Sequence, residues 1–280
     1  MNTRLVGSEM CIRDSSTAGQ ALGIPATVTI SGASAYNNAY EASSVQAFAA
    51  AGDPSLLRVA EVDYVKPEQM QSMEFGFRGK LSRTFTVDAA VYRNDFQDFI
   101  NTQVVLSPLY GEVGDGGLSV LAMANQDFET WSSYTNSPAE ISSWGISIGM
   151  ATKIFGNFDL SGSYTKAKLE FEQDLYPDFR TNWNTPEHKF KAQFGNTELF
   201  KNFGFNVAWR YWSEYLWQAS FGDGMVPETH VIDAQFNLTV PKWKSTIKVG
   251  ATNLGGDEYF TAFGSGFIGA QYYISWTANN

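Results

Sequence analysis

The chain alternates apolar and polar residues over long stretches, and this two-residue period constrains its fold more than any other feature. Within residues 144–150, Trp144, Ile146, Ile148 and Met150 are apolar, and every residue between them is Gly or Ser. Successive side chains of a β-strand point to opposite sides, so the period predicts a strand with one apolar and one polar face. Recurrence of this pattern predicts about nine strands from Met73 onward.

The connections between the predicted strands are alternately short and long. Tight turns are predicted near residues 82, 156, 201 and 243, and long loops over 106–136, 172–186, 218–228 and 254–269. The strand that begins near Phe85 is expected to continue to about Val105. Since neighbouring strands of such a meander are antiparallel, all the tight turns would lie at one end of the sheet.

Turns sorted by length in this way are typical of an outer-membrane barrel, whose strands face lipid on one side and a polar interior on the other. We therefore predict an all-β fold, a partial antiparallel transmembrane β-barrel of about nine or ten meandering strands. It would have short periplasmic turns and long extracellular loops. Phe158 and Phe203 near the turns, and Tyr164 and Tyr211 toward the loops, indicate two aromatic belts. A soluble β-sandwich also alternates, but it does not require turn lengths to be sorted by end.

Composition narrows the function further. The 280-residue chain has a net charge of -10, and its 19 Lys and Arg are scattered, which argues against a nucleic-acid partner. A single cysteine, Cys11, permits no internal disulfide and no cysteine-based metal site. His188 and His230 lack spaced partners, and the carboxylates at 170–174 lack the glycine of a calcium loop, so no metal and no cofactor are predicted.

Three segments resemble motifs in the C-terminal half of the barrel of TonB-dependent outer-membrane receptors. Residues 65–79 look like the family's Pro-Glu motif, here Pro67-Glu68, followed by a descending strand with a Glu-x-Gly core. Residues 249–259, with Asn253-Leu254, look like its penultimate-strand motif, and 269–276 resemble its closing strand. The last strand departs from the pattern because Thr-Ala-Asn-Asn follows Trp276.

This resemblance implies a non-enzymatic importer in the cell outer membrane. Its ligand would be a small-molecule nutrient bound by the intact receptor: a siderophore, a cobalamin-like molecule or an oligosaccharide. Other partners would be outer-membrane lipid and, only through a missing plug region, TonB; no nucleic acid is expected. The nine strands are too few for a 22-stranded transporter, so we expect a fragment without plug, signal peptide or first barrel half.

The resemblance also divides the chain into three parts. Residues 1–15 lack the apolar core of a signal peptide and resemble translated sequencing-adapter sequence, so we expect a non-native extension. Residues 16–65 are rich in Ala and Ser and are expected to be an extracellular-loop-like segment, or else structure of uncertain register. Residues 66–280 would be the C-terminal part of the receptor barrel.

Two groups of residues are candidates for function. Exposed loop aromatics often bind ligands, although packing among the loops is the alternative. The predicted ligand-contact residues are Trp131, Tyr134, Trp217, Phe221, Phe260 and Phe263. The predicted lumen-facing charges are Arg78, Lys80, Asp88, Lys189, Lys191, Arg210, Asp233 and Lys248.

Two rival functions remain open on sequence grounds. One is a soluble or surface β-sandwich that binds carbohydrate through its aromatic residues. The other is an outer-membrane enzyme, which would need a catalytic cluster of polar residues at the strand tops. The sequence offers no such cluster, so no catalytic residue is predicted.

Overall fold

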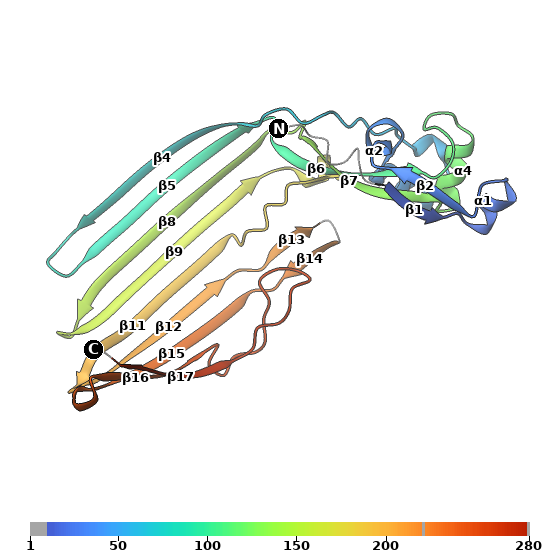
Figure 1. The fold of residues 1–280 in the computed structure, drawn as a ribbon. Helices are drawn as coiled ribbons and strands as arrows, with labels where there is room; N and C mark the ends of the chain where they lie inside the picture. Colours follow the sequence, from blue (N-terminus) through green and yellow to red (C-terminus); the bar gives the residue numbers. More distant parts are fainter. Residues whose placement is uncertain (1–9, 220–221, 279–280) are drawn as a thin grey trace. The chain divides into compact units, whose positions relative to one another are not determined.

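The computed structural model describes residues 10–219 and 222–278, which belong to two compact units (Figure 1). The first, here called the sheet unit, comprises Gln71–Asp95, Ser142–Glu170 and Trp183–Asn280. The second, the mixed unit, comprises Met1–Met70, Phe96–Ile141 and Phe171–Asn182. The chain thus passes between the two units several times.

A nine-stranded sheet forms the body of the sheet unit, and each strand lies beside its predecessor and its successor (Figure 1). In sequence order the strands are β4 (Gln69–Lys80), β5 (Thr86–Gln97), β8 (Ile141–Ile154), β9 (Phe158–Glu170), β11 (His188–Phe200), β12 (Phe203–Trp212), β15 (Thr229–Val240), β16 (Ser245–Thr252) and β17 (Gln271–Ala278). β4 and β17 are its edges. The predicted nine-stranded meander is confirmed.

Tight turns join β4 to β5, β8 to β9, β11 to β12 and β15 to β16, and all lie at one end of the sheet (Figure 1). In three of these turns the backbone enters the left-handed region that tight reversals favour. Phe155 has a φ of 47° and Gly156 one of 88°, while Asn202 and Lys244 have φ of 68° and 45°. The β15–β16 turn also contains the short helix η3 (Pro241–Trp243). Turn lengths are therefore sorted by end, as predicted.

The two faces of the sheet differ as the two-residue period requires. Cross-strand register aligns Phe194, Val207 and Ala234 on one face and places Gln193, Ala208 and Asp233 on the other. The apolar face is exposed: the accessible fraction is 38% for Val207, 51% for Phe236 and 76% for Ile274. A sandwich would bury these side chains against a second sheet.

Aromatic rows lie near both ends of the apolar face. Toward the tight turns, the ring of Phe194 lies 5.4 Å from that of Phe158 and 5.6 Å from that of Phe205. Toward the loops, the ring of Phe190 lies 4.5 Å from that of Tyr164 and 6.4 Å from that of Trp209. The rows stand where the sequence indicates aromatic belts.

The mixed unit contains short helices and strands. Its first segment forms β1 (Met10–Asp14), α1 (Thr17–Ala21), β2 (Thr27–Ser31), α2 (Ser34–Asn37), β3 (Tyr40–Glu41), α3 (Ala42–Ala51) and η1 (Pro54–Leu56). Its later segments form β6 (Ile100–Pro108), α4 (Leu118–Ala124), β7 (Phe128–Asn136), η2 (Gln173–Leu175) and β10 (Phe179–Arg180). β6 pairs with β3, β7 and β10, and β1 pairs with β2. In the described residues no helix is long and apolar enough to cross a membrane.

Two expectations for the region after Phe85 are wrong. The strand does not run to Val105: β5 ends at Gln97, Asp98 has a left-handed φ of 52°, and β6 belongs to a different sheet. Residues 106–136 are not an open connection either, because they contain α4 and β7. The physical reason is burial: Val105 is fully buried, and it packs in a hydrophobic cluster that includes Ala35 and Leu109.

Residues 10–65 also have a defined structure. Met10–Asp14 pair with Thr27–Ser31, and the helices and strands that follow contribute Val45 and Phe48 to a second buried cluster. That residues 1–15 are non-native remains a prediction, and positions 1–9 lie outside the described residues. The loop-like origin of 16–65 remains a prediction too.

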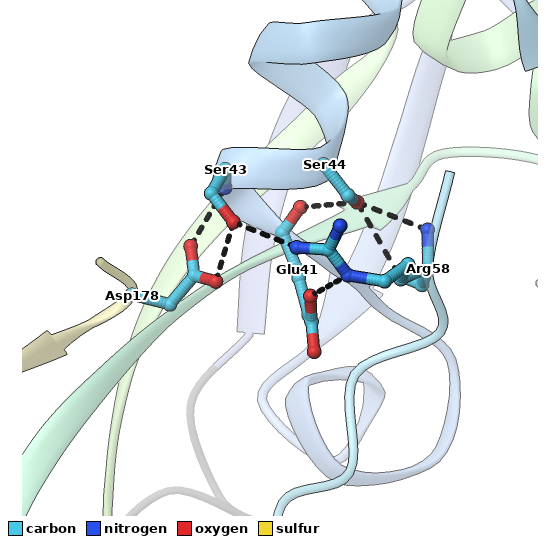
Figure 2. A network of polar contacts seen from close by, with 5 residues as sticks. All are labelled: Glu41, Ser43, Ser44, Arg58 and Asp178. Carbon is cyan, nitrogen blue, oxygen red and sulfur yellow. Dashed lines mark hydrogen bonds and ion pairs between the residues drawn. The ribbon is translucent and has the colours of Figure 1, made fainter. Parts of the chain in front are cut away.

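Two buried carboxylates tie distant segments of the mixed unit together. Asp178 accepts hydrogen bonds from the backbone N–H of Ser43 at 2.6 Å and from its hydroxyl at 2.7 Å (Figure 2). It thereby satisfies the first turn of α3, where Glu41 gives no side-chain cap. Asp127 binds Ser16 in the same manner, at 2.6 and 2.8 Å.

Ion pairing reinforces the Asp178 contact. The guanidinium of Arg58 donates to the carboxylate of Glu41 at 2.5 Å and to the hydroxyl of Ser43 at 3.3 Å (Figure 2). The backbone N–H of Arg58 donates to the hydroxyl of Ser44 at 3.1 Å. Three chain segments therefore meet at the start of α3.

Candidate functional site

The loop end of the sheet unit carries a group of aromatic side chains. After β12 the chain forms the hairpin β13 (Tyr215–Ala219) and β14 (Gly222–Val226), in which Trp217 pairs with Gly224. The connection 253–270 packs against this hairpin. We call Tyr215, Trp217, Tyr259, Phe260, Phe263 and Phe267 the aromatic loop cluster.

Glycine permits the closest contact in this cluster. A Cβ atom on Gly224 would lie 2.2 Å from the ring of Phe263, so the ring occupies the space of the missing side chain. The hydroxyl of Tyr215 donates to the carbonyl of Thr261 at 2.7 Å. Burial raises the pKa of the Tyr215 phenol. The hairpin and the 253–270 connection are thus held together.

A third connection joins the same group. The side-chain amide of Asn184 accepts from the backbone N–H of Gln218 at 2.7 Å and donates to its carbonyl at 3.0 Å. Those two bonds have the same donor and acceptor pattern as the backbone pairing that a neighbouring strand would form with β13. The ring of Trp212 also meets that of Tyr259 edge to face at 5.5 Å.

A polar network fixes the base of the 253–270 connection. Asp233 accepts from the guanidinium of Arg210 at 2.8 Å and from the backbone N–H of Asn253 at 3.1 Å. Asn253 is 2% exposed and donates from its amide to the carbonyl of Asp257 at 2.9 Å. A Cβ on Gly256 would lie 2.1 Å from the Asn253 amide oxygen. The Asn-Leu motif therefore anchors this loop to β15.

The structure brings together some of the predicted ligand-contact residues. Trp217, Phe260 and Phe263 belong to the aromatic loop cluster, where Phe260 meets Phe267 at 5.5 Å. Tyr134 lies on β7 of the mixed unit and is 59% exposed. Phe221 lies outside the described residues. Sequence reasoning missed Tyr215, although its position between Trp212 and Trp217 marks an aromatic-rich segment.

Trp131 is wrong as a ligand-contact candidate. It is 6% exposed and packs in the hydrophobic cluster of the mixed unit, beside Val105 in the register of β6 with β7. A side chain at this position cannot touch a ligand without unfolding the cluster. The structure assigns it to stability, because burial of a tryptophan is among the largest single hydrophobic contributions.

The eight predicted lumen charges lie on the polar face of the sheet. Arg78 pairs with Asp88, and Arg210 pairs with Asp233. In the part of the chain that is described, the four lysines of this set, Lys80, Lys189, Lys191 and Lys248, have no ion pair within 4.0 Å. A hollow of about 390 Å³ on this face is lined by residues that include Ser163, Lys191, Gln193 and Arg210. That the face lines a lumen remains a prediction.

Both histidines lie on the apolar face near the loops and make ring contacts. Nδ1 of His188 lies 2.9 Å from the Tyr164 hydroxyl, and Nδ1 of His230 accepts from the Trp209 indole at 3.3 Å. Among the described residues, no group of three or more His, Cys, Asp and Glu is arranged to hold a metal.

Comparisons with a family model and with solved structures agree on the fold of this chain. The chain matches the family model described as TonB dependent receptor-like, beta-barrel over residues 18–254. No curated protein sequence matches it. Its fold is similar to that of the copper transporter OprC, with a TM-score of 0.53 and 16% identity over 76% of this chain and 31% of that chain.

Two further structures resemble it. The FrpB iron transporter from Neisseria meningitidis has a TM-score of 0.52 and 12% identity, over 77% of this chain and 32% of that chain. The siderophore receptor PiuA from Acinetobacter baumannii has a TM-score of 0.50 and 17% identity, over 77% and 27%. At such identities the likeness concerns the fold alone. This chain spans less than a third of the length of each of these structures.

Proposed function

Because this chain belongs to the β-barrel family of TonB-dependent receptors, we propose that it forms part of the barrel wall of an outer-membrane receptor for nutrient uptake. The exposed apolar face of the nine-stranded sheet carries the proposal. In water, the exposed side chains of Val207, Phe236 and Ile274 would be unfavourable, whereas lipid tails are a suitable solvent for them. Charged side chains collect on the opposite face.

The wall would be completed by other strands. β4 and β17 each have one unpaired edge in the described sheet, and unpaired backbone groups cannot face lipid. This chain covers less than a third of each neighbouring receptor structure, which supports a fragment of a larger barrel. In the intact receptor, TonB would act through a plug region.

The ligand would be a small nutrient: a siderophore, a cobalamin-like molecule or an oligosaccharide. Trp217, Phe260 and Phe263 of the aromatic loop cluster would contact it, with Tyr134 as a further candidate. The loops supply binding and the strands supply the wall, so we expect no catalysis and no cofactor.

Spin labels at two adjacent positions test which face of the sheet contacts lipid. In the intact receptor carrying Cys11→Ser, Val207→Cys and Ala208→Cys receive the same nitroxide label, and the receptor is reconstituted into lipid vesicles. We expect oxygen, which concentrates in lipid, to relax the label at 207, and a water-soluble nickel complex to relax the label at 208. Equal accessibility of the two labels would contradict the proposal, and solubility as a folded monomer without detergent would favour a carbohydrate-binding module.

A further inference from the structure

Charge is distributed unevenly between the two units. By sequence, the mixed unit has sixteen Asp and Glu and five Lys and Arg, a net charge of −11. The sheet unit has thirteen and fourteen, a net charge of +1. The net negative charge of the chain therefore comes entirely from the mixed unit.

Charge is also sorted along the sheet unit. The segments 211–229 and 253–270, which form part of the loop end, contain no Lys or Arg. Their acidic residues are Glu214, Asp223, Glu228, Asp257 and Glu258, all exposed. By contrast, the tight turns near 83, 201 and 243 carry basic residues: Arg83, Lys201, Lys242 and Lys244.

Most of the loop-end carboxylates have no basic partner inside the unit. In the described part of the chain, no ion pair within 4.0 Å involves Glu214, Glu228, Asp257 or Glu258. An unpaired exposed carboxylate remains solvated and available to a cation from outside. These residues lie in the same two segments as the aromatic loop cluster.

Aromatic rings supply the second recognition element. Tyr215 and Trp217 are neighbours in β13, with ring centroids 6.4 Å apart, and Phe267 is 67% exposed. The face of an aromatic ring attracts ammonium and guanidinium groups, and tryptophan does so most strongly. Aromatic rings and carboxylates in segments without Lys or Arg favour the binding of an organic cation and disfavour the binding of a polyanion.

We propose that the aromatic loop cluster recognises a ligand that carries ammonium or guanidinium groups. The inference rests on the proposed function, since it requires these loops to face the side from which the nutrient arrives. The exposed carboxylates of segments 211–229 and 253–270 would raise the association rate of such a ligand and lower that of an anionic chelate. Both effects weaken as salt is added.

Matched peptides test the charge preference. The full chain in detergent micelles is titrated with fluorescent tetra-arginine, tetra-glutamate and, as a neutral probe, labelled maltotetraose, at low and high salt. Fluorescence anisotropy gives the affinities. We expect tetra-arginine to bind most tightly at low salt. Tighter binding of tetra-glutamate or of the neutral sugar would overturn the proposal.

Variants distinguish binding at the aromatic loop cluster from attraction by the net charge of the chain. The double variant Glu214→Gln, Glu228→Gln should weaken tetra-arginine binding about fivefold. Its control near the tight turns, Asp159→Asn with Glu198→Gln, should change the affinity less than about twofold. Trp217→Leu keeps the net charge and should weaken binding about threefold, whereas Trp243→Leu in a tight turn should not. Equal losses at the two ends of the sheet would reject the cluster as the site.

Circular dichroism of each variant distinguishes loss of binding from loss of folding. The spin-label experiment separates this inference from the proposed function. If the labels at 207 and 208 report lipid and water but tetra-arginine has no preference, only the charge inference fails. If the two labels are equally accessible, the proposed function fails whatever the peptides show.

Discussion

The sheet unit and the mixed unit place the same kinds of apolar residues in opposite environments. Ile274 of β17 is 76% exposed, whereas Val105 of β6 is fully buried in a cluster with Ala35 and Trp131. The mixed unit buries part of its apolar side chains in compact clusters, whereas the sheet unit displays them along one face. If the proposed function is correct, the two units meet different solvents, and the arrangement of their apolar residues, more than the number, reflects which solvent each unit meets.

The sharpest test of the mixed unit is its buried tryptophan. Trp131→Ala should lower its free energy of unfolding by about 3–5 kcal/mol, because the substitution leaves a large cavity in the cluster. Tyr134→Ala, three residues along β7 at a side chain that is 59% exposed, should cost far less. Urea unfolding followed by hydrogen exchange at the amides of β6 and β7 measures both. A small effect of Trp131→Ala would mean that the unit has no compact core.

The corresponding test of the sheet unit places a charge on each face. In the intact receptor in lipid vesicles, Ile148→Arg or Val207→Arg should cost about 2–4 kcal/mol, since a charge would face the midplane of the bilayer. Ser147→Arg and Ala208→Arg on the polar face should cost little. Reversible urea unfolding in vesicles gives the free energies. Equal penalties on the two faces would remove the distinction between the units.

Glycines beneath aromatic rings provide a smaller effect within the sheet unit. A Cβ on Gly250 would lie 2.5 Å from the ring of Tyr273, which must then move, so Gly250→Ala should cost about 1–3 kcal/mol. Gly149, also in a strand, has no atom closer than 3.9 Å to its Cβ position and serves as the control. Similar costs at both sites would show that strand propensity dominates over the contact.

Removing the carboxylate that caps α3 tests how the mixed unit joins its segments. Asp178→Ala leaves the Ser43 N–H unpaired and should lower the free energy of unfolding of this unit by about 1–2 kcal/mol. Asp174→Ala, at an exposed position nearby, should have almost no effect. Thermal unfolding monitored by circular dichroism compares the two. An unchanged midpoint for Asp178→Ala would show that the contact adds nothing.

How far the sequence predicts each unit follows from the range of the interactions involved. The strand at 144–150 can be predicted because its two-residue period is local. The position of Trp131 cannot, since its burial depends on Ala35 and Val105, which are distant in sequence or belong to another strand. The same holds for Asp178, whose partner Ser43 lies 135 residues away. The fold of the mixed unit is determined by burial between residues distant in sequence, which a local pattern does not reveal.

The candidate site was only partly predictable for the same reason. Aromatic residues in 217–263 could be singled out by type and by their place in loops. That Phe263 lies over Gly224, and that Tyr215 binds the carbonyl of Thr261, depends on contacts between two separate connections. The Asn253 motif was visible in the sequence, but its bond to Asp233 required the register of β15 with β16.

The ring of Tyr273 fills the volume above Gly250, and its hydroxyl donates to Gln235 two strands away at 2.9 Å. Positions 250 and 273 therefore cannot change independently: a larger residue at the first leaves no room for the aromatic at the second. Among homologues the two sites should vary as a pair, and loss of the tyrosine should release position 235 as well. The absence of a side chain at position 250 should thus restrict the choice of residue on three neighbouring strands.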